Sequence, residues 1–357
     1  MSTTSETTEL TRLPGLDVAP SPETRTEARP EHYIERGPRK RLMVFSGRSH
    51  PELAQRIAQA LGVELGEIEL ETFANDETYC RYGESIRGAD VFIVQTGCRP
   101  VDRNVMELVF MIQAAKLASA KRITAVIPWF PYSRQDRKAK PREPISGRLV
   151  ADMLQLAGAD RVLTMDLHAG QIQGFFTIPV DHMTALPLFA RHFRDLGAYG
   201  EGVVSVAPDA GRARVAVRFA EMLDADFAIM HKTRPSHDTV EVTEVTGPVR
   251  GKIAIVGDDL TTTGGTLIAG AQALKEHGAT DVWIFVTHPL LSDEGLEQLG
   301  EADVGRIVVT DTVPIDPRKK PEKMTVLTVS GLLAQTITNV FGDESVSAIF
   351  GGENQLF

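Results

Sequence analysis

The sequence predicts an α/β protein with two similar halves, each a mainly parallel β-sheet flanked by helices. From Arg41 onward, short apolar runs such as Ile253 to Val256 alternate with amphipathic stretches of helical length, the rhythm of parallel strands joined by helical crossovers. The alternation stops in a turn-rich stretch near residues 178–187 and then starts again. A chain of 357 residues also suits two domains of ordinary size.

These observations divide the chain into four segments. Residues 1–38 are rich in Thr, Ser, Glu and Pro and cannot bury enough apolar area to offset chain entropy, so we expect a mobile N-terminal extension. An N-terminal α/β domain follows at residues 39–184 and a C-terminal α/β domain at residues 185–340. Residues 341–357 form a tail.

The expected elements follow from the period of the apolar residues. In the first half we expect strands at residues 41–47, 89–97, 121–130 and 160–168, and helices at residues 51–61, 105–118 and 145–158. In the second half we expect strands at residues 202–211, 227–232, 251–259, 280–289 and 304–312, and helices at residues 213–223 and 266–278. A short strand, a helix and the tail complete residues 324–350.

Composition limits the classes of function. Hydrophobic residues make up 42% of the chain and charged residues 24%, as in globular proteins with sizeable cores. The net charge of −10 argues against a nucleic-acid surface, and no apolar run is long enough to span a membrane. No secretory signal opens the chain, and its two cysteines, Cys80 and Cys98, suit reduced thiols, so we expect a cytoplasmic protein.

The most informative segment is the turn that follows the apolar strand at residues 251–259. Gly264 and Gly265 let backbone amides approach an anion, and the helix start adds unpaired N–H groups and a positive dipole. The adjacent carboxylates of Asp258 and Asp259 can accept hydrogen bonds from two neighbouring sugar hydroxyls. Thr263 and Thr266 add hydroxyl donors. The pattern favours a sugar-phosphate site over a plain strand-to-helix turn.

Five segments in order carry a family resemblance. Residues 252–274 are similar to the 5-phosphoribosyl-diphosphate loop of the type I phosphoribosyltransferase fold, which serves both transferases that consume the diphosphate and the synthetase that makes it. The other four resemble ribose-phosphate pyrophosphokinase (PRPP synthetase) of the phosphate-dependent class. They are residues 73–88, residues 126–138, residues 162–176, and the pair Val206–Gly211 and His231–Ser236.

The resemblance implies two phosphoribosyltransferase-like domains and the transfer of pyrophosphate from ATP to C1 of ribose 5-phosphate, giving PRPP and AMP. It implies that Phe73 stacks on adenine, that Asn75 and Glu77 read its edge, and that Lys232 and Arg234 are catalytic. ATP would also meet Arg134, Gln135, Asp136 and His168, with Arg134 on its triphosphate, and Mg²⁺ would meet His168 and Asp209. Ribose 5-phosphate would meet Asp209, Asp258, Asp259, Thr262, Thr263, Gly264, Gly265 and Thr266.

Regulation is also implied. The segments at residues 83–88 and 344–350 resemble those that build an allosteric anion site between subunits, with phosphate and ADP as effectors. The residues concerned are Ser85, Arg87, Gln173, Ser345, Val346 and Ser347. Such a site requires a homo-oligomer, most simply dimers assembled into a hexamer, and it places the tail at a subunit interface.

Four positions depart from the family pattern. Arg212 stands where the family has a second Gly, Val215 replaces a cation, Thr262 replaces a frequent Asp, and Pro289 replaces a Gly. They leave open a regulatory, synthetase-associated subunit as the non-enzyme alternative. A phosphoribosyltransferase is the alternative enzyme, but it would have no use for the segments assigned to ATP.

Overall fold

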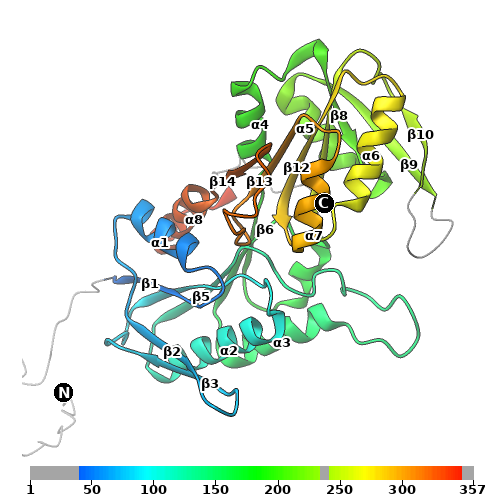
Figure 1. Ribbon diagram of the computed structural model, residues 1–357. Helices are drawn as coiled ribbons and strands as arrows, with labels where there is room; N and C mark the ends of the chain where they lie inside the picture. Colours follow the sequence, from blue (N-terminus) through cyan, green and yellow to red (C-terminus); the bar gives the residue numbers. More distant parts are fainter. Residues whose placement is uncertain (1–39, 234–240, 348–357) are drawn as a thin grey trace, which may run out of the picture. The chain divides into compact units, whose positions relative to one another are not determined.

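The computed structural model describes residues 40–233 and 241–347, and the predicted N-terminal extension lies outside them. The first sheet is wholly parallel, with strand order β1-β4-β5-β6-β7 (Figure 1). Its strands are β1 (Leu42–Ser46), β4 (Asp90–Val94), β5 (Arg122–Ile127), β6 (Arg161–Met165) and β7 (Val180–Met183). Because β4 and β5 are central and apolar, their interior residues are buried on both faces.

Three helices and a hairpin complete the first half. They are α1 (Pro51–Leu61), α2 (Val101–Leu117) and α3 (Ser146–Ala157), with the antiparallel pair β2 (Ile68–Thr72) and β3 (Thr78–Tyr82). Helix α1 begins with Pro51 and ends at Gly62 in the left-handed conformation, with a φ of 70°. The hydroxyl of Tyr82 donates to the carbonyl of Met111 at 2.9 Å and so fastens the hairpin to α2.

The second sheet has seven strands in the order β10-β9-β8-β11-β12-β13-β14, and only β10 runs antiparallel to its neighbour. The strands are β8 (Val203–Ala207), β9 (Asp226–Thr233), β10 (Glu241–Thr246), β11 (Ile253–Thr261), β12 (Asp281–Pro289), β13 (Arg306–Thr310) and β14 (Met324–Leu327). The helices are α4 (Leu186–Asp195), α5 (Ala213–Leu223), α6 (Gly265–Glu276), α7 (Asp293–Glu301) and α8 (Ser330–Gly342). No helix in the described part of the chain has the length and apolarity that crossing a bilayer requires.

The predicted α/β class is therefore confirmed, and most predicted elements are present. Helices α1 and α5 match the expected bounds, whereas α2 begins at Val101 instead of Val105. The turn-rich stretch at residues 178–187 contains a strand that was not predicted from the sequence, because β7 lies within it and pairs with β6. This edge strand has only four residues and lies between Pro179 and Pro187, so it carries no clear apolar period.

A shared core connects elements that are distant in the sequence. Aromatic rings pack together within it, and those of Phe219 and Phe285 lie 4.4 Å apart between centroids at an interplanar angle of 39°. The same core takes in Leu53 and Ile57 from α1 and Leu333 from α8, so the last helix packs against the first one. The sequence had not indicated a partner for α8, and the domain boundary near residue 184 stays a prediction.

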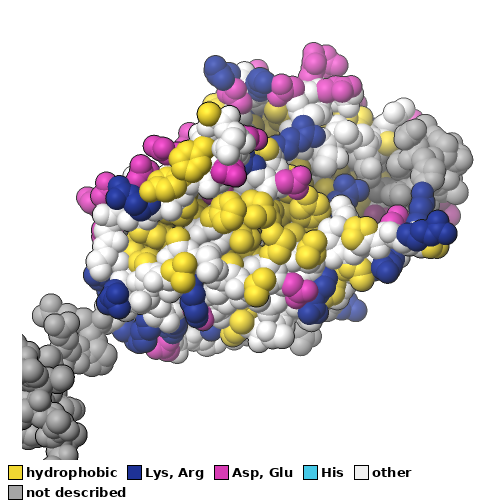
Figure 2. All heavy atoms as spheres, turned by 90° about the horizontal axis from the view of Figure 1, so that it is seen from below, with side chains coloured by type: hydrophobic (Ala, Val, Ile, Leu, Met, Phe, Trp, Pro, Cys, Tyr) yellow, Lys and Arg dark blue, Asp and Glu magenta, His cyan; other side chains and the backbone are white. Residues whose placement is uncertain are grey.

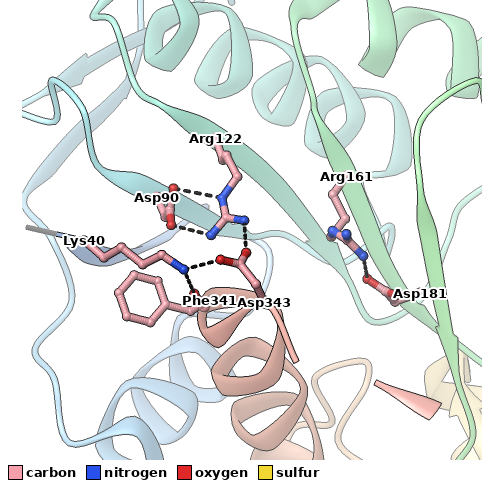
Figure 3. A network of polar contacts seen from close by, with 7 residues as sticks. All are labelled: Lys40, Asp90, Arg122, Arg161, Asp181, Phe341 and Asp343. Atoms are coloured by element: carbon pink, nitrogen blue, oxygen red, sulfur yellow. Dashed lines mark hydrogen bonds and ion pairs between the residues drawn. The ribbon is translucent and has the colours of Figure 1, made fainter. Parts of the chain in front are cut away.

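Ion pairs fix the end of α8 at the amino ends of β4 and β5 (Figure 3). The guanidinium of Arg122 makes two hydrogen bonds to Asp90, at 3.0 and 2.6 Å, and also pairs with Asp343. Lys40 pairs with Asp343 and donates to the carbonyl of Phe341. Asp343, with a positive φ of 60°, thus ends the helix and anchors the segment that follows it.

Candidate active site

A polar cleft of about 460 Å³ lies where β8 and β11 end. The carboxyl ends of parallel strands are the usual place for ligands in open α/β sheets. Two turns form its walls, one after β8 and one between β11 and α6, and the other half of the chain adds two side chains. The lining residues are Arg134, His168, Asp209, Gly211, Arg212 and residues 258–267.

Asp258 and Asp259 near the end of β11 are held by cations at the base of this cleft. The side chain of Asp259 is only 2% exposed, and its Oδ1 pairs with the guanidinium of Arg212 at 2.9 Å. Its Oδ2 lies 2.7 Å from Nδ1 of His168. The Oδ1 of Asp258 accepts the backbone N–H of Asp259 at 2.9 Å and faces Nε of Arg212 at 3.3 Å.

These contacts move the pKa values of the two aspartates in opposite directions. Burial and the charge of Asp259 raise the pKa of Asp258 above its usual range. Burial also acts against ionisation of Asp259, but Arg212 and the hydrogen bond from His168 outweigh it and lower the pKa of that carboxyl. The hydrogen bond to Asp259 raises the pKa of His168 above its usual value. The site therefore favours a charged Asp259 and a protonated His168.

The turn after β11 presents backbone N–H groups. Gly264 has a φ of +77°, a conformation that glycine adopts without strain. The hydroxyl of Thr261 accepts the N–H of Gly264 at 3.1 Å and steadies the turn. Helix α6 starts directly after Gly264 without a side-chain cap. Its first N–H groups and dipole therefore suit a phosphate at the cleft wall.

Asp209 and Arg134 face this wall from two other strands. Asp209 follows β8 in an extended conformation and starts a short 3-10 turn at Ala210–Arg212. Arg134 follows β5 and is exposed. Arg134 and Thr262 also line a second, mostly apolar cavity of about 380 Å³ that adjoins the cleft and includes Trp129.

The support of His168 was not predicted from the sequence. Two residues before it, Asp166 has a φ of +32°, and its carboxylate accepts the hydroxyl of Thr287 at 2.7 Å and the N–H of Ala185 at 3.0 Å. Nε2 of buried His182 accepts the N–H of Leu167 at 2.8 Å. Asp166 could have been found from the Asp-Leu-His run that it shares with His168. No feature of the sequence indicated that His182 supports the same segment.

The predicted adenine residues lie outside the cleft. Phe73, Asn75 and Glu77 are exposed at the tip of the β2–β3 hairpin. Phe73 and Glu77 line an open groove of about 790 Å³ beside α2. Gln135 and Asp136 make hydrogen bonds to nearby side chains. Gln135 accepts a hydrogen bond from the hydroxyl of Ser146 at 2.6 Å, and Asp136 accepts one from the side-chain amide of Gln171. The structure therefore gathers Arg134, His168, Asp209 and residues 258–266, but not the hairpin.

Of the two predicted catalytic residues, Lys232 and Arg234, the structure describes only the backbone of Lys232. Lys232 lies on β9, opposite Val242 of β10. Arg234 lies outside the described residues. The role assigned to this pair stays a prediction.

The predicted effector residues occupy separate segments of the chain. Ser85 and Arg87 are exposed, and the carbonyl of Ser85 accepts a hydrogen bond from Arg41. The hydroxyls of Ser345 and Ser347 lie 2.8 Å apart, beside Val346. The amide of Gln173 donates to the carbonyl of Gly170 at 3.1 Å. Arg41 thus contacts the first segment, and its neighbour Lys40 pairs with Asp343, shortly before the second.

The four departures differ in position. Arg212 lies inside the cleft and Thr262 at its border with the apolar cavity. Pro289 lines that cavity at the end of β12. Val215 packs against the core from α5. Only Arg212 contacts the carboxylates proposed for ribose.

Comparison with known proteins gives matches along almost the whole described chain. Residues 42–158 match the N-terminal domain of ribose phosphate pyrophosphokinase, and residues 232–351 match the phosphoribosyl synthetase-associated domain. A ribose-phosphate pyrophosphokinase of Caldanaerobacter subterraneus is 48% identical over 87% of this chain and 98% of its own length. Ribose-phosphate pyrophosphokinase 2 of Schizosaccharomyces pombe is 45% identical over 87% of this chain and 97% of its own length.

A solved structure agrees with these sequence matches. The crystal structure of phosphoribosylpyrophosphate synthetase from Mycobacterium smegmatis superposes with a TM-score of 0.79 at 45% sequence identity. The superposition covers 85% of this chain and 100% of that one.

Proposed function

This chain belongs to the ribose-phosphate pyrophosphokinase family, and we propose that the polar cleft is where it moves pyrophosphate from ATP to C1 of ribose 5-phosphate. The observation that carries this assignment is the continuous wall from Asp258 to Thr266. It provides two carboxylates and then an uncapped helix start, facing Asp209, His168 and Arg134 across one cavity. A sugar that carries both hydroxyls and a phosphate fits this order of groups.

The second sheet binds the sugar phosphate in this proposal. The 5-phosphate lies at residues 262–266, where backbone N–H groups and threonine hydroxyls donate to it. Asp258 and Asp259 accept hydrogen bonds from the two ribose hydroxyls. The C1 hydroxyl is then directed toward Asp209, which follows the neighbouring strand β8.

The first sheet meets the polyphosphate of ATP. Arg134 neutralises phosphate charge with its planar guanidinium, and His168, held through Nδ1 by Asp259, donates from its other nitrogen. The oxygen of the C1 hydroxyl attacks the β-phosphorus, the bond from that phosphorus to the α-phosphate bridge breaks, and AMP leaves. Lys232 and Arg234 stabilise the charge on the transferring group.

The donor set fits a magnesium ion. The described residues contain no cluster of three or more His, Cys, Asp or Glu that could hold a metal by themselves. Mg²⁺ characteristically takes one or two carboxylates plus substrate phosphates, and Asp209 offers such a carboxylate in the cleft. When bound, the ion neutralises phosphate charge. His168 lines the same cleft, and because Mg²⁺ prefers oxygen ligands and keeps several waters, His168 would contact the ion through water.

The surface supports the homo-oligomer. Exposed apolar side chains gather on the face of α2 and α3, which pack together (Figure 2). They are Met106, Phe110, Leu117, Leu149 and Leu156. Apolar side chains gathered on one face mark interaction sites, so we assign this face to a second copy of the chain. A second copy would also allow the hairpin that carries Phe73 to serve a cleft other than its own.

Effector control is part of the same proposal. Phosphate and ADP would bind between subunits, at Ser85 and Arg87 of one copy and residues 345–347 of another. Hydroxyls and a guanidinium suit such anions.

The test is ribose-dependent AMP formation. Purified protein with Mg²⁺ and ATP should release AMP only when ribose 5-phosphate is added, with equimolar PRPP. Formation of a nucleoside monophosphate and pyrophosphate from a nucleobase and PRPP would instead identify a phosphoribosyltransferase. A folded protein that binds ATP but makes no AMP would identify a regulatory subunit, and the active partner would then have to be supplied.

A further inference from the structure

The carboxylates proposed for ribose are already occupied from within the chain. Arg212 pairs with Asp259 through one terminal nitrogen at 2.9 Å and faces Asp258 through Nε at 3.3 Å. His168 takes the other oxygen of Asp259. Three of the four carboxylate oxygens therefore have a partner before any sugar arrives.

The planar guanidinium lies against both carboxylates, as a pair of neighbouring sugar hydroxyls would. A guanidinium presents its donors in a rigid fork. The vicinal hydroxyls of ribose present two donors with similar spacing. The side chain of Asp259 is only 2% exposed, and Arg212 and His168 take its two oxygens, so a sugar hydroxyl can reach Asp259 only if one of these side chains moves. Because one guanidinium spans both carboxylates, its departure from Asp259 also frees Asp258.

The resting contact is incomplete. Nε of Arg212 is buried and has no hydrogen-bond partner of acceptable geometry. Leaving a buried donor unpaired costs free energy. Sugar hydroxyls that donate to the carboxylates with better geometry can therefore displace Arg212.

We propose that Arg212 occupies the ribose-hydroxyl position in the free enzyme and must leave both aspartates when ribose 5-phosphate binds. Each binding event then breaks the Arg212 pairs, so this residue lowers the affinity for the sugar phosphate. Arg212 is an affinity-setting residue of the cleft, and this inference rests on the proposed function of Asp258 and Asp259. Its backbone ends the turn after Asp209, so its side chain can swing without unfolding α5.

The test compares Arg212→Ala with Arg214→Ala. Arg214 lies in the first turn of α5 and is exposed, so its replacement removes the same charge outside the cleft. In Arg212→Ala the dissociation constant for ribose 5-phosphate, measured by calorimetry with Mg²⁺ and α,β-methylene-ATP, should fall about ten-fold, the size of one charge-assisted contact. The KM for ribose 5-phosphate should fall with it and the KM for ATP should not change. Arg214→Ala should match the wild type.

A second variant keeps the test decisive if Arg212→Ala does not fold. Arg212→Lys retains a cation beside the carboxylates but cannot reach both of them, so its affinity for ribose 5-phosphate should lie above that of the wild type by a smaller factor. Weaker or unchanged binding in a folded Arg212 variant would overturn the inference and make Arg212 a substrate ligand or a structural residue. The calorimetry needs no turnover, so failure of this inference is distinct from the absence of AMP, which would contradict the proposed function.

Discussion

The two sheets contribute to one cleft in opposite ways. At the end of the second sheet, Asp258, Asp259 and Arg212 bond to one another, and Thr261 fixes the N–H of Gly264, so the wall is assembled without a ligand. At the end of β5 in the first sheet, Arg134 is exposed. The sugar phosphate is small and can be bound by a preformed wall. The longer triphosphate of ATP would instead be bound by the long, flexible side chain of Arg134.

The two sides of the cleft should therefore differ in what limits the affinity for their ligand. A preformed wall saves the entropy of ordering on binding, but it also brings internal competitors such as Arg212. An exposed arginine has no such competitor and must be ordered by the nucleotide. Changes in the wall should therefore affect the sugar first, and changes at Arg134 should affect ATP first.

The largest effect on the KM for ribose 5-phosphate is expected from a substitution at Gly264, in the preformed wall. In Gly264→Ala the new Cβ would lie 2.7 Å from the Leu299 side chain, in a left-handed conformation that costs about 1–2 kcal/mol. We expect a lower melting temperature and a KM for ribose 5-phosphate raised about a hundred-fold, since the helix start would shift away from the phosphate.

Gly265→Ala is the matched control, because its Cβ meets only the Thr263 hydroxyl at 3.6 Å. Its melting temperature should stay at the wild-type value. Equal loss of stability in both variants would show that the positive φ of Gly264 does not hold the wall.

The second effect concerns Arg134, on the other side of the comparison. Arg134→Ala should raise the KM for ATP about ten-fold, the worth of a charge-assisted contact, and leave the melting temperature nearly unchanged because the side chain is exposed. Steady-state kinetics with each substrate varied in turn would measure this. Arg137→Ala, at a neighbouring exposed position, is the control. An equal rise in the KM for ribose 5-phosphate would mean that the two sheets do not divide the substrates.

The preformed wall was the more predictable of the two sides. Two Asp, a Thr/Gly run and a helix start follow one another within the chain, so residues 258–266 carry their chemistry in local order. The Arg212 pairs were not predictable, because they join the turn after β8 to the end of β11 and depend on these strands being neighbours. The sequence showed only that Arg212 replaces a glycine.

The fold shows the same division between local and distant information. Strands such as β11 and helices such as α5 were expected from apolar period alone. The packing of α8 on α1 was not, because a helix's partner depends on the path of the whole chain. His182 was missed for the same reason: its role is to accept the N–H of Leu167, which only the pairing of β6 with β7 brings within reach.

A smaller effect should appear in the pH dependence of stability. Burial lowers the pKa of His182 to about 4, so between about pH 6.5 and pH 4 the unfolded chain binds a proton that the folded chain does not. Stability should therefore fall as the pH falls through this window. The melting temperature of His182→Gln should decline less steeply than that of the wild type, since the amide oxygen can accept the N–H of Leu167. His277→Gln, at an exposed position, should keep the wild-type slope.

The smallest effect is expected at Asp343, at the amino ends of β4 and β5 and away from the substrates. Arg122 pairs with Asp343 and also with Asp90, but these carboxylates are 56% and 1% exposed respectively. Water already solvates Asp343, so Asp343→Asn should leave both KM values unchanged and move the melting temperature little. Asp90→Asn removes a buried charge from the same guanidinium and should cost about 1–3 kcal/mol. Both variants remove a carboxylate charge from the same guanidinium, that of Arg122, so a difference in their calorimetric melting temperatures would report burial alone. Equal losses of stability in the two variants would contradict this explanation.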